Sequence, residues 1–157
     1  MAELQQIEYE LYRKKRFVVV FPEKFEIQSY LVQKVNKPKM LHGVWQDFYF
    51  EFIDVVADSI SPKIMDMLNY CNLNRNSPLF TMVLVGLDPF GIEIERWTVQ
   101  VSEIVSVDFG EYDYGNDDMQ MVKVILRPSI CVLNNSTVGE WEKYFKRTVL
   151  IEKYSSK

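Results

Sequence analysis

Two groups of carboxylates have a spacing that could serve catalysis or metal binding. Glu93 and Glu95 stand two positions apart, so on a strand they share one face and could act as a general acid and base. The acidic stretch 110–118 (GEYDYGNDD) could offer oxygen ligands to calcium. Its acids do not follow the alternate spacing of the helix-flanked calcium loop. A wet strand face and a solvated connecting loop are the simpler interpretations.

The other reactive residue types form no catalytic or metal-binding pattern. The triplet at 108–110 (DFG) matches one protein-kinase motif, but neither a glycine-rich loop nor an HRD segment accompanies it. No GxSxG, GxGxxG or Walker loop occurs. Cys71 and Cys131 fall in apolar segments and are interpreted as core residues, and one histidine, His42, argues against His-based metal sites. We therefore expect no enzyme activity, no metal and no cofactor.

Composition indicates one folded domain rather than a fibrous or disordered chain. Of 157 residues, 48% are hydrophobic and 25% charged, which suffices for a real core. No apolar run approaches the ~20 residues that a membrane span needs, and the first residues do not form a signal segment. Two cysteines do not make a disulfide framework, so a reducing compartment is expected.

Charge is unevenly distributed along the chain. Residues 1–40 carry net +3, residues 41–118 net −11 and residues 119–157 net +4. Surfaces of opposite charge can attract copies of one chain head to tail, although the acids could equally be solvated strand faces and loops. The acidic middle argues against tight nucleic-acid binding, which needs clustered positive charge. The basic cluster at 13–16 is interpreted as a solvated or subunit-contacting segment rather than a nucleic-acid patch.

Alternating side chains predict a mainly β chain, a two-sheet sandwich or barrel with one peripheral helix. Segment 44–55 is the clearest strand, because Phe48, Phe50 and Phe52 share one face while polar residues occupy the other. A helix is predicted over 62–71, with Ser61 as its N-cap. Further strands are expected at 16–21, 27–35, 80–85, 92–109, 119–126, 130–133 and 148–151, with an interruption at Pro128 and a short helix near 140–144.

The predicted organisation is an N-terminal arm, 1–15, followed by a single β domain, 16–157. Several predicted strands are long, with aromatic residues on one face and polar residues on the other. Long exposed strand edges aggregate unless another chain pairs with them. The sequence therefore indicates a protein that assembles.

The order of these segments resembles the tail tube proteins of contractile-tailed bacteriophages, a fold shared with type VI secretion tubes. The likeness extends over about 16–133. In the first half it is carried by 16–22 (RFVVVFP), 29–35 (SYLVQKV) followed by Pro38, 45–50 (WQDFYF) and the helix at 62–71. In the second half it is carried by 86–91 (GLDPFG), 92–97 (IEIERW), 104–110 (IVSVDFG), 112–115 (YDYG) and 119–126 (MQMVKVIL). Agreement is least in the connector 110–118 and beyond residue 134.

The resemblance implies a structural virion protein of the ring-forming tail tube fold. Subunits of that family form stacked hexameric rings around a continuous inner β-barrel, through which DNA passes without sequence recognition during genome delivery. The expected location is the virion tail, after assembly in the host cytoplasm, next to tail sheath and baseplate or tail terminator proteins. Candidate lumen or ring-contact acids are Asp47, Glu51, Glu93, Glu95, Asp108, Glu111, Asp113, Asp117 and Asp118, and candidate inter-ring basic contacts are Arg13, Lys14, Lys15 and Arg16.

Two other interpretations stay open at this point. A tail tube initiator or baseplate ring protein of the same fold would form rings without polymerising alone. A small-molecule-binding β-barrel would instead use the aromatic interior as a pocket.

Overall fold

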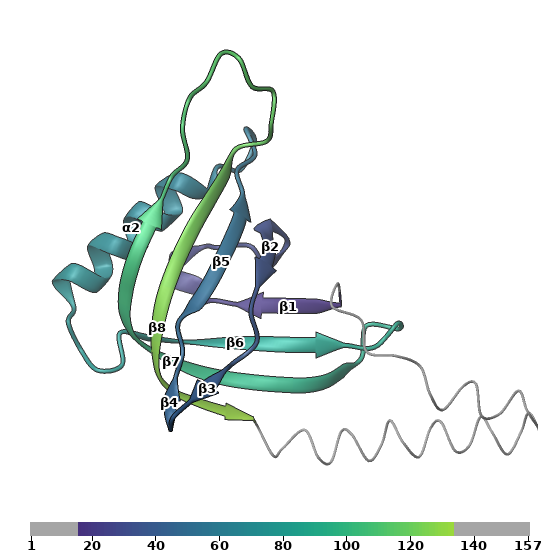
Figure 1. Cartoon of the computed structure of the whole chain (residues 1–157), viewed down its shortest axis with the longest axis vertical. Coiled ribbons are helices and arrows are strands. Elements are labelled where there is room, and N and C mark those ends of the chain that lie inside the picture. The colour runs from purple at the N-terminus through teal and green to yellow at the C-terminus, as the bar shows by residue number, and fades with distance from the viewer. Residues whose placement is uncertain (1–15, 134–157) are drawn as a thin grey trace, which may run out of the picture. The chain divides into compact units, whose positions relative to one another are not determined.

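Strands and one α-helix make up the described part of the chain, residues 16–133 of a computed structural model (Figure 1). The expected mainly β fold with one helix is confirmed. The elements in chain order are β1 (Phe17–Val20), the 3-10 turns η1 (Glu23–Phe25) and η2 (Ser29–Leu31), β2 (Val32–Val35), β3 (Met40–Leu41), β4 (Val44–Trp45), β5 (Phe48–Ile53), α2 (Ile60–Leu73), β6 (Phe80–Leu87), β7 (Glu93–Asp108) and β8 (Met121–Leu133).

Six strands form one sheet in the order β1-β6-β7-β8-β5-β2, and β3 pairs with β4 in a separate hairpin. The described residues divide into two compact units. The smaller unit consists of residues 16–18, 85–96 and 133, and the larger unit of residues 19–84 and 97–132. The single domain 16–157 remains a prediction. The expected arm 1–15, the basic residues Arg13, Lys14 and Lys15, and the tail elements at 140–144 and 148–151 lie outside the described residues.

The smaller unit contains the turn that joins β6 to β7. Asp88 Oδ1 accepts hydrogen bonds from the backbone N–H of Phe90 (2.9 Å) and of Ile92 (2.7 Å), and Gly91 takes a φ of +80°. Asp88 is only 5% exposed, and its Oδ2 is buried with no hydrogen-bond partner among the described residues. The predicted turn at 86–91 is thus built around one buried carboxylate.

Phenylalanine rings fill the core of the larger unit. Phe48, Phe50 and Phe52 are at most 1% exposed, as the alternation along β5 predicts. Phe21 lies 5.6 Å from Phe50 and 6.4 Å from Phe80, measured between ring centroids. Rings at these separations add to the free energy gained by burying their surface. The other face of β5 is thereby left for polar residues.

Helix α2 contributes its apolar side to the larger unit. Ile64, Met67 and Cys71 are buried, as their helical spacing predicts. The predicted start at residue 62 is wrong by two residues, because Asp54 stabilises an earlier first turn. Its carboxylate accepts hydrogen bonds from Ser59 Oγ, Ile60 N and Ser61 Oγ. Within residues 16–133, no helix is sufficiently long and apolar to span a lipid bilayer.

Strand β8 is continuous through Pro128, so the predicted interruption there is wrong. The antiparallel ladder between β5 and β8 runs from Ile53 opposite Met121 to Phe48 opposite Leu126. Pro128 lies beyond the last of these pairs, where β5 has ended and a missing N–H donor breaks no bond to it. Proline is therefore tolerated within a strand that the sequence pattern divides in two.

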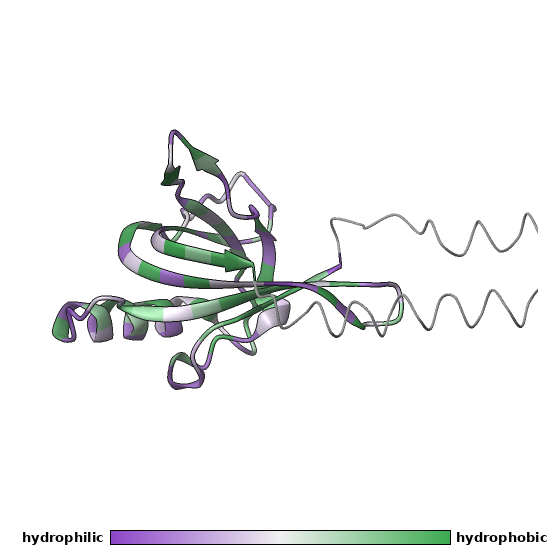
Figure 2. Ribbon diagram, turned by 90° about the horizontal axis from the view of Figure 1, so that it is seen from below, coloured by the Kyte–Doolittle hydropathy of each residue, from purple (hydrophilic) through white to green (hydrophobic). Residues whose placement is uncertain are grey.

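The hairpin β3–β4 stands apart from the strands of the sheet in Figure 2, where its two strands are coloured as hydrophobic. Met40, Leu41 and Val44 on it are between 45% and 60% exposed. Its base is fixed by the ring of Trp45, which lies 6.4 Å from that of Trp97 on β7. The predicted strand 44–55 is thus two strands, β4 and β5.

Candidate functional site

The solvent side of the sheet carries charged residues from four strands, which we call the charged face. Successive side chains on a strand point to opposite faces, so Asp47, Tyr49 and Glu51 point away from the buried phenylalanines. Tyr49 is 57% exposed, in contrast to its neighbour Phe50 at 1%. The members of the charged face are Lys34, Asp47, Glu51, Glu103, Lys123 and Arg127.

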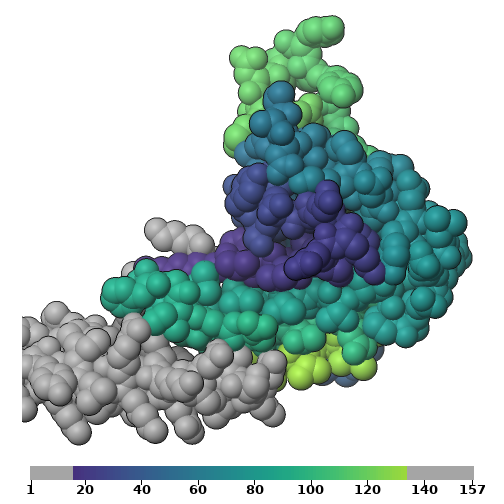
Figure 3. Space-filling view, turned by 180° about the vertical axis from the view of Figure 1, so that it is seen from behind, coloured from purple at the N-terminus to yellow at the C-terminus, as the bar shows by residue number. Residues whose placement is uncertain are grey.

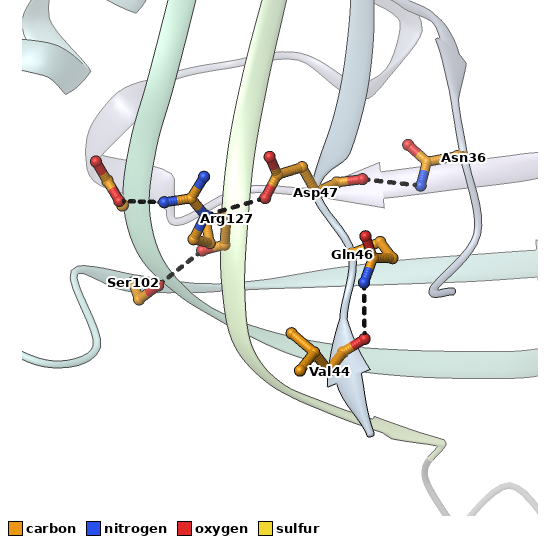
Figure 4. Close-up of polar contacts among 7 residues, drawn as sticks. Asn36, Val44, Gln46, Asp47, Ser102 and Arg127 are labelled. Atoms are coloured by element: carbon orange, nitrogen blue, oxygen red, sulfur yellow. Dashed lines mark hydrogen bonds and ion pairs between the residues drawn. The ribbon is translucent and has the colours of Figure 1, made fainter. Parts of the chain in front are cut away.

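Arg127 on β8 links carboxylates on both sides of it. Its Nε lies 3.2 Å from Asp47 Oδ1, and its Nη1 lies 3.0 Å from Glu103 Oε2 on β7. Figure 4 shows Arg127 between Asp47 and Ser102, whose hydroxyl donates to the Arg127 carbonyl oxygen at 3.0 Å. The hydrogen bond with Asp47 is the main cause that raises the pKa of the Arg127 guanidinium. An arginine side chain is charged at ordinary pH in any case, so the group acts as a fixed positive charge.

A second row of charges crosses β2, β5 and β8. Lys34 lies opposite Glu51 in the register of β2 and β5, and Glu51 lies opposite Lys123 in the register of β5 and β8. Residues directly opposite each other in a ladder project from the same face, and unlike charges there are stabilising. Glu51 thus has a lysine on either side.

Each strand of the charged face carries one sign of charge. In the order β2, β5, β8, β7 the signs are positive, negative, positive and negative. Three basic and three acidic residues make the six members of the charged face neutral in sum. Sequence reasoning identified Asp47 and Glu51 but missed Lys34, Glu103, Lys123 and Arg127, because only the strand order brings them together.

The connector between β7 and β8, residues 109–120, is exposed along its length. Tyr112 and Tyr114 are fully accessible, and Figure 3 shows the connector standing clear of the surface around it. At its base Gly110 has a φ of +89°, and a Cβ there would lie 2.8 Å from Gln120 Oε1. Gln120 Nε2 in turn donates to the Glu111 carbonyl oxygen at 2.7 Å. The base is thus closely packed, whereas the two tyrosines above it are fully exposed among residues 16–133.

Two of the predicted acids, Asp108 at the end of β7 and Asp113 in the connector, accept hydrogen bonds from nearby backbone N–H groups. Asp108 accepts from the N–H of Gly110 and Asp113 from the N–H of Gly115, both at 2.9 Å. Glu111, Asp117 and Asp118 are exposed. Residues 16–133 contain no group of three His, Cys, Asp or Glu side chains placed to hold a metal ion.

The paired glutamates of the sequence analysis belong to the smaller unit, away from the connector in sequence. Glu93 Oε1 lies 2.5 Å from Arg96 Nη2, so an arginine neutralises this carboxylate. Glu95 is half-buried on the same strand, and Arg16, also predicted as a contact, is half-buried before β1. The side chain of Glu93 is thus occupied by an ion pair within its own strand.

Both cysteines are buried thiols, in agreement with their interpretation as core residues. Burial raises the pKa of Cys131 to about 11 and also raises the pKa of Cys71. The neutral thiol is a poor nucleophile. Burial and a raised pKa thus leave both thiols neutral and inaccessible to solvent.

One further carboxylate, Asp58, was missed by sequence reasoning and ties η2 to the start of α2. It accepts from Tyr30 Oη (2.7 Å) and lies 2.6 Å from Lys63 Nζ. The hydrogen bond with Lys63 is the main cause that lowers the pKa of Asp58. These contacts position a helix rather than a substrate.

Solved structures of contractile injection systems match this chain. A chain of the PVC sheath–tube complex in its extended state has a TM-score of 0.61 and 12% identity, over 83% of this chain and 95% of that chain. A chain of the PVC sheath/tube terminator in its extended state has a TM-score of 0.59 and 12% identity, over 80% of this chain and 98% of that chain. A chain of the anti-feeding prophage baseplate has a TM-score of 0.53 and 14% identity, over 80% of this chain and 97% of that chain.

The chain has a tail-tube-like fold. No family model matches the sequence, and no curated protein matches it in sequence. The identities of 12% to 14% establish shared architecture and not shared activity. The chain aligns with almost the full length of each of these structures, so the resemblance in the sequence to tail tube proteins is confirmed at the level of fold.

Proposed function

We propose that this protein is a structural component of a contractile phage tail or injection particle, and specifically a tube subunit that forms stacked hexameric rings. The observation that carries the proposal is the charged face, which covers one side of a sheet in a tail-tube-like fold. A tube needs a rigid wall whose inner surface is wet and does not retain what passes. A face with paired charges over a phenylalanine core meets both requirements.

The proposed mechanism is passive conduction through a channel. The charged face would line the lumen, and DNA or a protein cargo would slide along it. Nucleic acid is held tightly where a protein replaces condensed counterions with its own positive charges. The lysines and arginine of the charged face already have carboxylate neighbours, so they release few counterions. The partners would be further copies of the chain, a tail sheath, and baseplate or tail terminator proteins, all within the virion tail.

A ring-forming initiator or baseplate protein of the same fold is the second candidate. It is favoured by the match to the anti-feeding prophage baseplate, which covers 97% of that chain. The small-molecule barrel has less support, because buried phenylalanine rings occupy the interior that a ligand would need: the ring of Phe50 lies 6.4 Å from that of Phe48 and 5.8 Å from that of Phe52.

Negative-stain electron microscopy of the purified full chain tests the proposal. Hollow tubes at high protein concentration support a tube subunit, and isolated rings support the initiator or baseplate alternative. Light scattering on the same sample gives the mass of the assembly. A monomer at millimolar concentration that forms neither rings nor tubes contradicts both candidates.

A further inference from the structure

The turn between β6 and β7 holds a buried carboxylate oxygen that lacks a hydrogen-bond donor among residues 16–133. Asp88 is 5% exposed, and its Oδ2 has no partner in this part of the chain. Burial removes the water that would otherwise solvate a carboxylate, so an unpaired oxygen in such a place is costly. A buried charge of this kind is usually paired with a cation.

The turn itself has no backbone donor left for Oδ2. Pro89 has no N–H, and the N–H groups of Phe90 and Ile92 both donate to the other oxygen, Oδ1. The N–H of Gly91 donates to the Asp88 carbonyl oxygen at 3.1 Å, and the N–H of Asp88 to the Ile92 carbonyl oxygen at 2.9 Å. A donor to Oδ2 must therefore come from outside the turn.

Strand β1 begins beside this turn. The N–H of Leu87 donates to the carbonyl oxygen of Arg16 at 2.9 Å, and both residues belong to the smaller unit. Figure 1 shows β1 and β6 as neighbours that run in opposite directions. In an antiparallel ladder, residues joined by such a bond lie directly opposite each other. One step further along both strands, the residue opposite Asp88 is Lys15.

Burial along the two strands agrees with this register. Counting in the other direction places Val19 opposite Leu84, and these side chains are 1% and 7% exposed. Alternate residues of a strand share a face, so Asp88 lies on the same face as Leu84, and position 15 on the same face as Val19. A side chain at position 15 is thus directed to the side of the sheet on which Asp88 lies.

We propose that Lys15 is the missing partner of Asp88, and that its ammonium group donates to Oδ2. The Cβ atoms of directly opposed residues are roughly 5 Å apart, which a lysine side chain spans, and unlike charges in such a pair are stabilising. A lysine can bury its aliphatic stem along apolar surface while its ammonium group reaches a polar atom. Lys14 lies on the opposite face of the strand and cannot take this role.

This ion pair fixes the place at which the N-terminal arm leaves the β domain. Residues 13–15 continue β1 alongside the β6–β7 turn, and residues 1–12 start from there. The candidate inter-ring cations are Arg13, Lys14, Lys15 and Arg16. Lys15 is then withheld from neighbouring molecules, because its charge is used within its own chain. The pairing does not depend on the proposed function.

A double-mutant cycle tests the pair. Asp88→Asn keeps an acceptor at Oδ1 and replaces Oδ2 with an amide donor, and Lys15→Met removes the charge while keeping a long apolar stem. Each single variant should raise the equilibrium constant for unfolding about 10-fold. The two losses should not add, because Asp88→Asn removes the buried charge that Lys15→Met leaves unpaired. The matched control is Lys14→Met, which should change the constant by no more than about 2-fold.

The measurement is urea unfolding of the full chain, at a concentration at which light scattering shows a monomer. Non-additive losses in the monomer support the pair. A Lys15→Met variant that unfolds like Lys14→Met overturns it, and so do losses that simply add. An effect found only in assembled protein would show that another copy supplies the cation, which also overturns the pair. None of these outcomes decides whether the chain forms tubes.

Acetylation of lysine amines gives a second readout, which does not depend on the folding of the Asp88→Asn variant. In the native wild-type monomer, Lys15 should react about 10-fold more slowly than Lys14 with an acetylating ester, because its amine must first leave the carboxylate. Mass spectrometry of the digested protein compares the two sites. In a folded Asp88→Asn variant the difference should disappear. Equal rates at the two lysines of the wild type would overturn the proposal.

Discussion

Strand β5, in the middle of the charged face, and residues 102–108 of β7, at its edge, differ in how completely the neighbouring strands of the same molecule surround them. Strand β5 has β2 and β8 on its two edges, buried phenylalanines on one face and paired charges on the other. Residues 102–108 of β7 and the connector that follows have one strand neighbour and exposed side chains on both faces. The first region is complete in a single molecule and stabilises the fold. The second exposes side chains and a strand edge to solvent.

The largest effect is expected for Phe50→Ala on β5. Its ring is 1% exposed and contacts Phe21, Phe48 and Phe52, so removing it should cost about 3–5 kcal/mol in the free energy of unfolding. The control is Tyr49→Ala on the same strand, where a side chain 57% exposed should cost less than about 1 kcal/mol. Urea unfolding measures both, and equal losses would contradict the division between the two faces.

A smaller loss is expected for Asp54→Ala, which removes the carboxylate that holds the first turn of α2. Three hydrogen bonds to Ser59, Ile60 and Ser61 disappear, at a cost of about 1–2 kcal/mol. Asp66→Ala, on the exposed side of the same helix, is the control and should be nearly neutral. Thermal unfolding followed by circular dichroism distinguishes them, and an unchanged midpoint for Asp54→Ala would contradict this role.

Arg127→Gln should destabilise the protein less than Asp54→Ala, because the Arg127 side chain is 50% exposed and water screens its ion pairs. The loss should fade as NaCl rises toward about 1 M, where charges interact only over about 3 Å. Unfolding in urea at two salt concentrations measures this. A loss that does not depend on salt would show that Arg127 acts through packing instead.

The smallest effect on folding is expected for the connector variant Tyr112→Ser/Tyr114→Ser. Both rings are fully exposed, so the free energy of unfolding should change by no more than about 0.5 kcal/mol. If the connector contacts other copies, the same variant should assemble at a higher protein concentration than the wild type. Unfolding and light scattering are measured on one preparation, and a large loss of stability would place the tyrosines in the fold itself.

Periodic elements were predictable from the sequence because their signal is local. The alternation at Phe48, Phe50 and Phe52 identified the buried face of β5, and the spacing of Ile64, Met67 and Cys71 identified that of α2. The mainly β fold and its likeness to tail tube proteins follow from the order of such segments.

The rest depends on contacts between distant residues. Asp47 was identified as an isolated acid, yet its partner Arg127 lies 80 positions away and becomes a neighbour only when β5 pairs with β8. Pro128 led to the prediction of a break in the strand. The proline is tolerated in β8 because β5 has already ended at that level, and the sequence alone does not show where β5 ends relative to β8. The start of α2 was misplaced because Asp54, just after the end of β5, and not Ser61, satisfies its first turn.

The alternation of sign from strand to strand also determines how far the charged face acts into solution. Neighbouring strands are about 4.8 Å apart, so a positive stripe and a negative stripe repeat over roughly 10 Å. Fields from such a pattern cancel within about that distance of the surface, whereas the field of an unpaired charge extends over a Debye length of similar size and varies with ionic strength. Farther from the surface, the six residues of the charged face contribute almost no net potential.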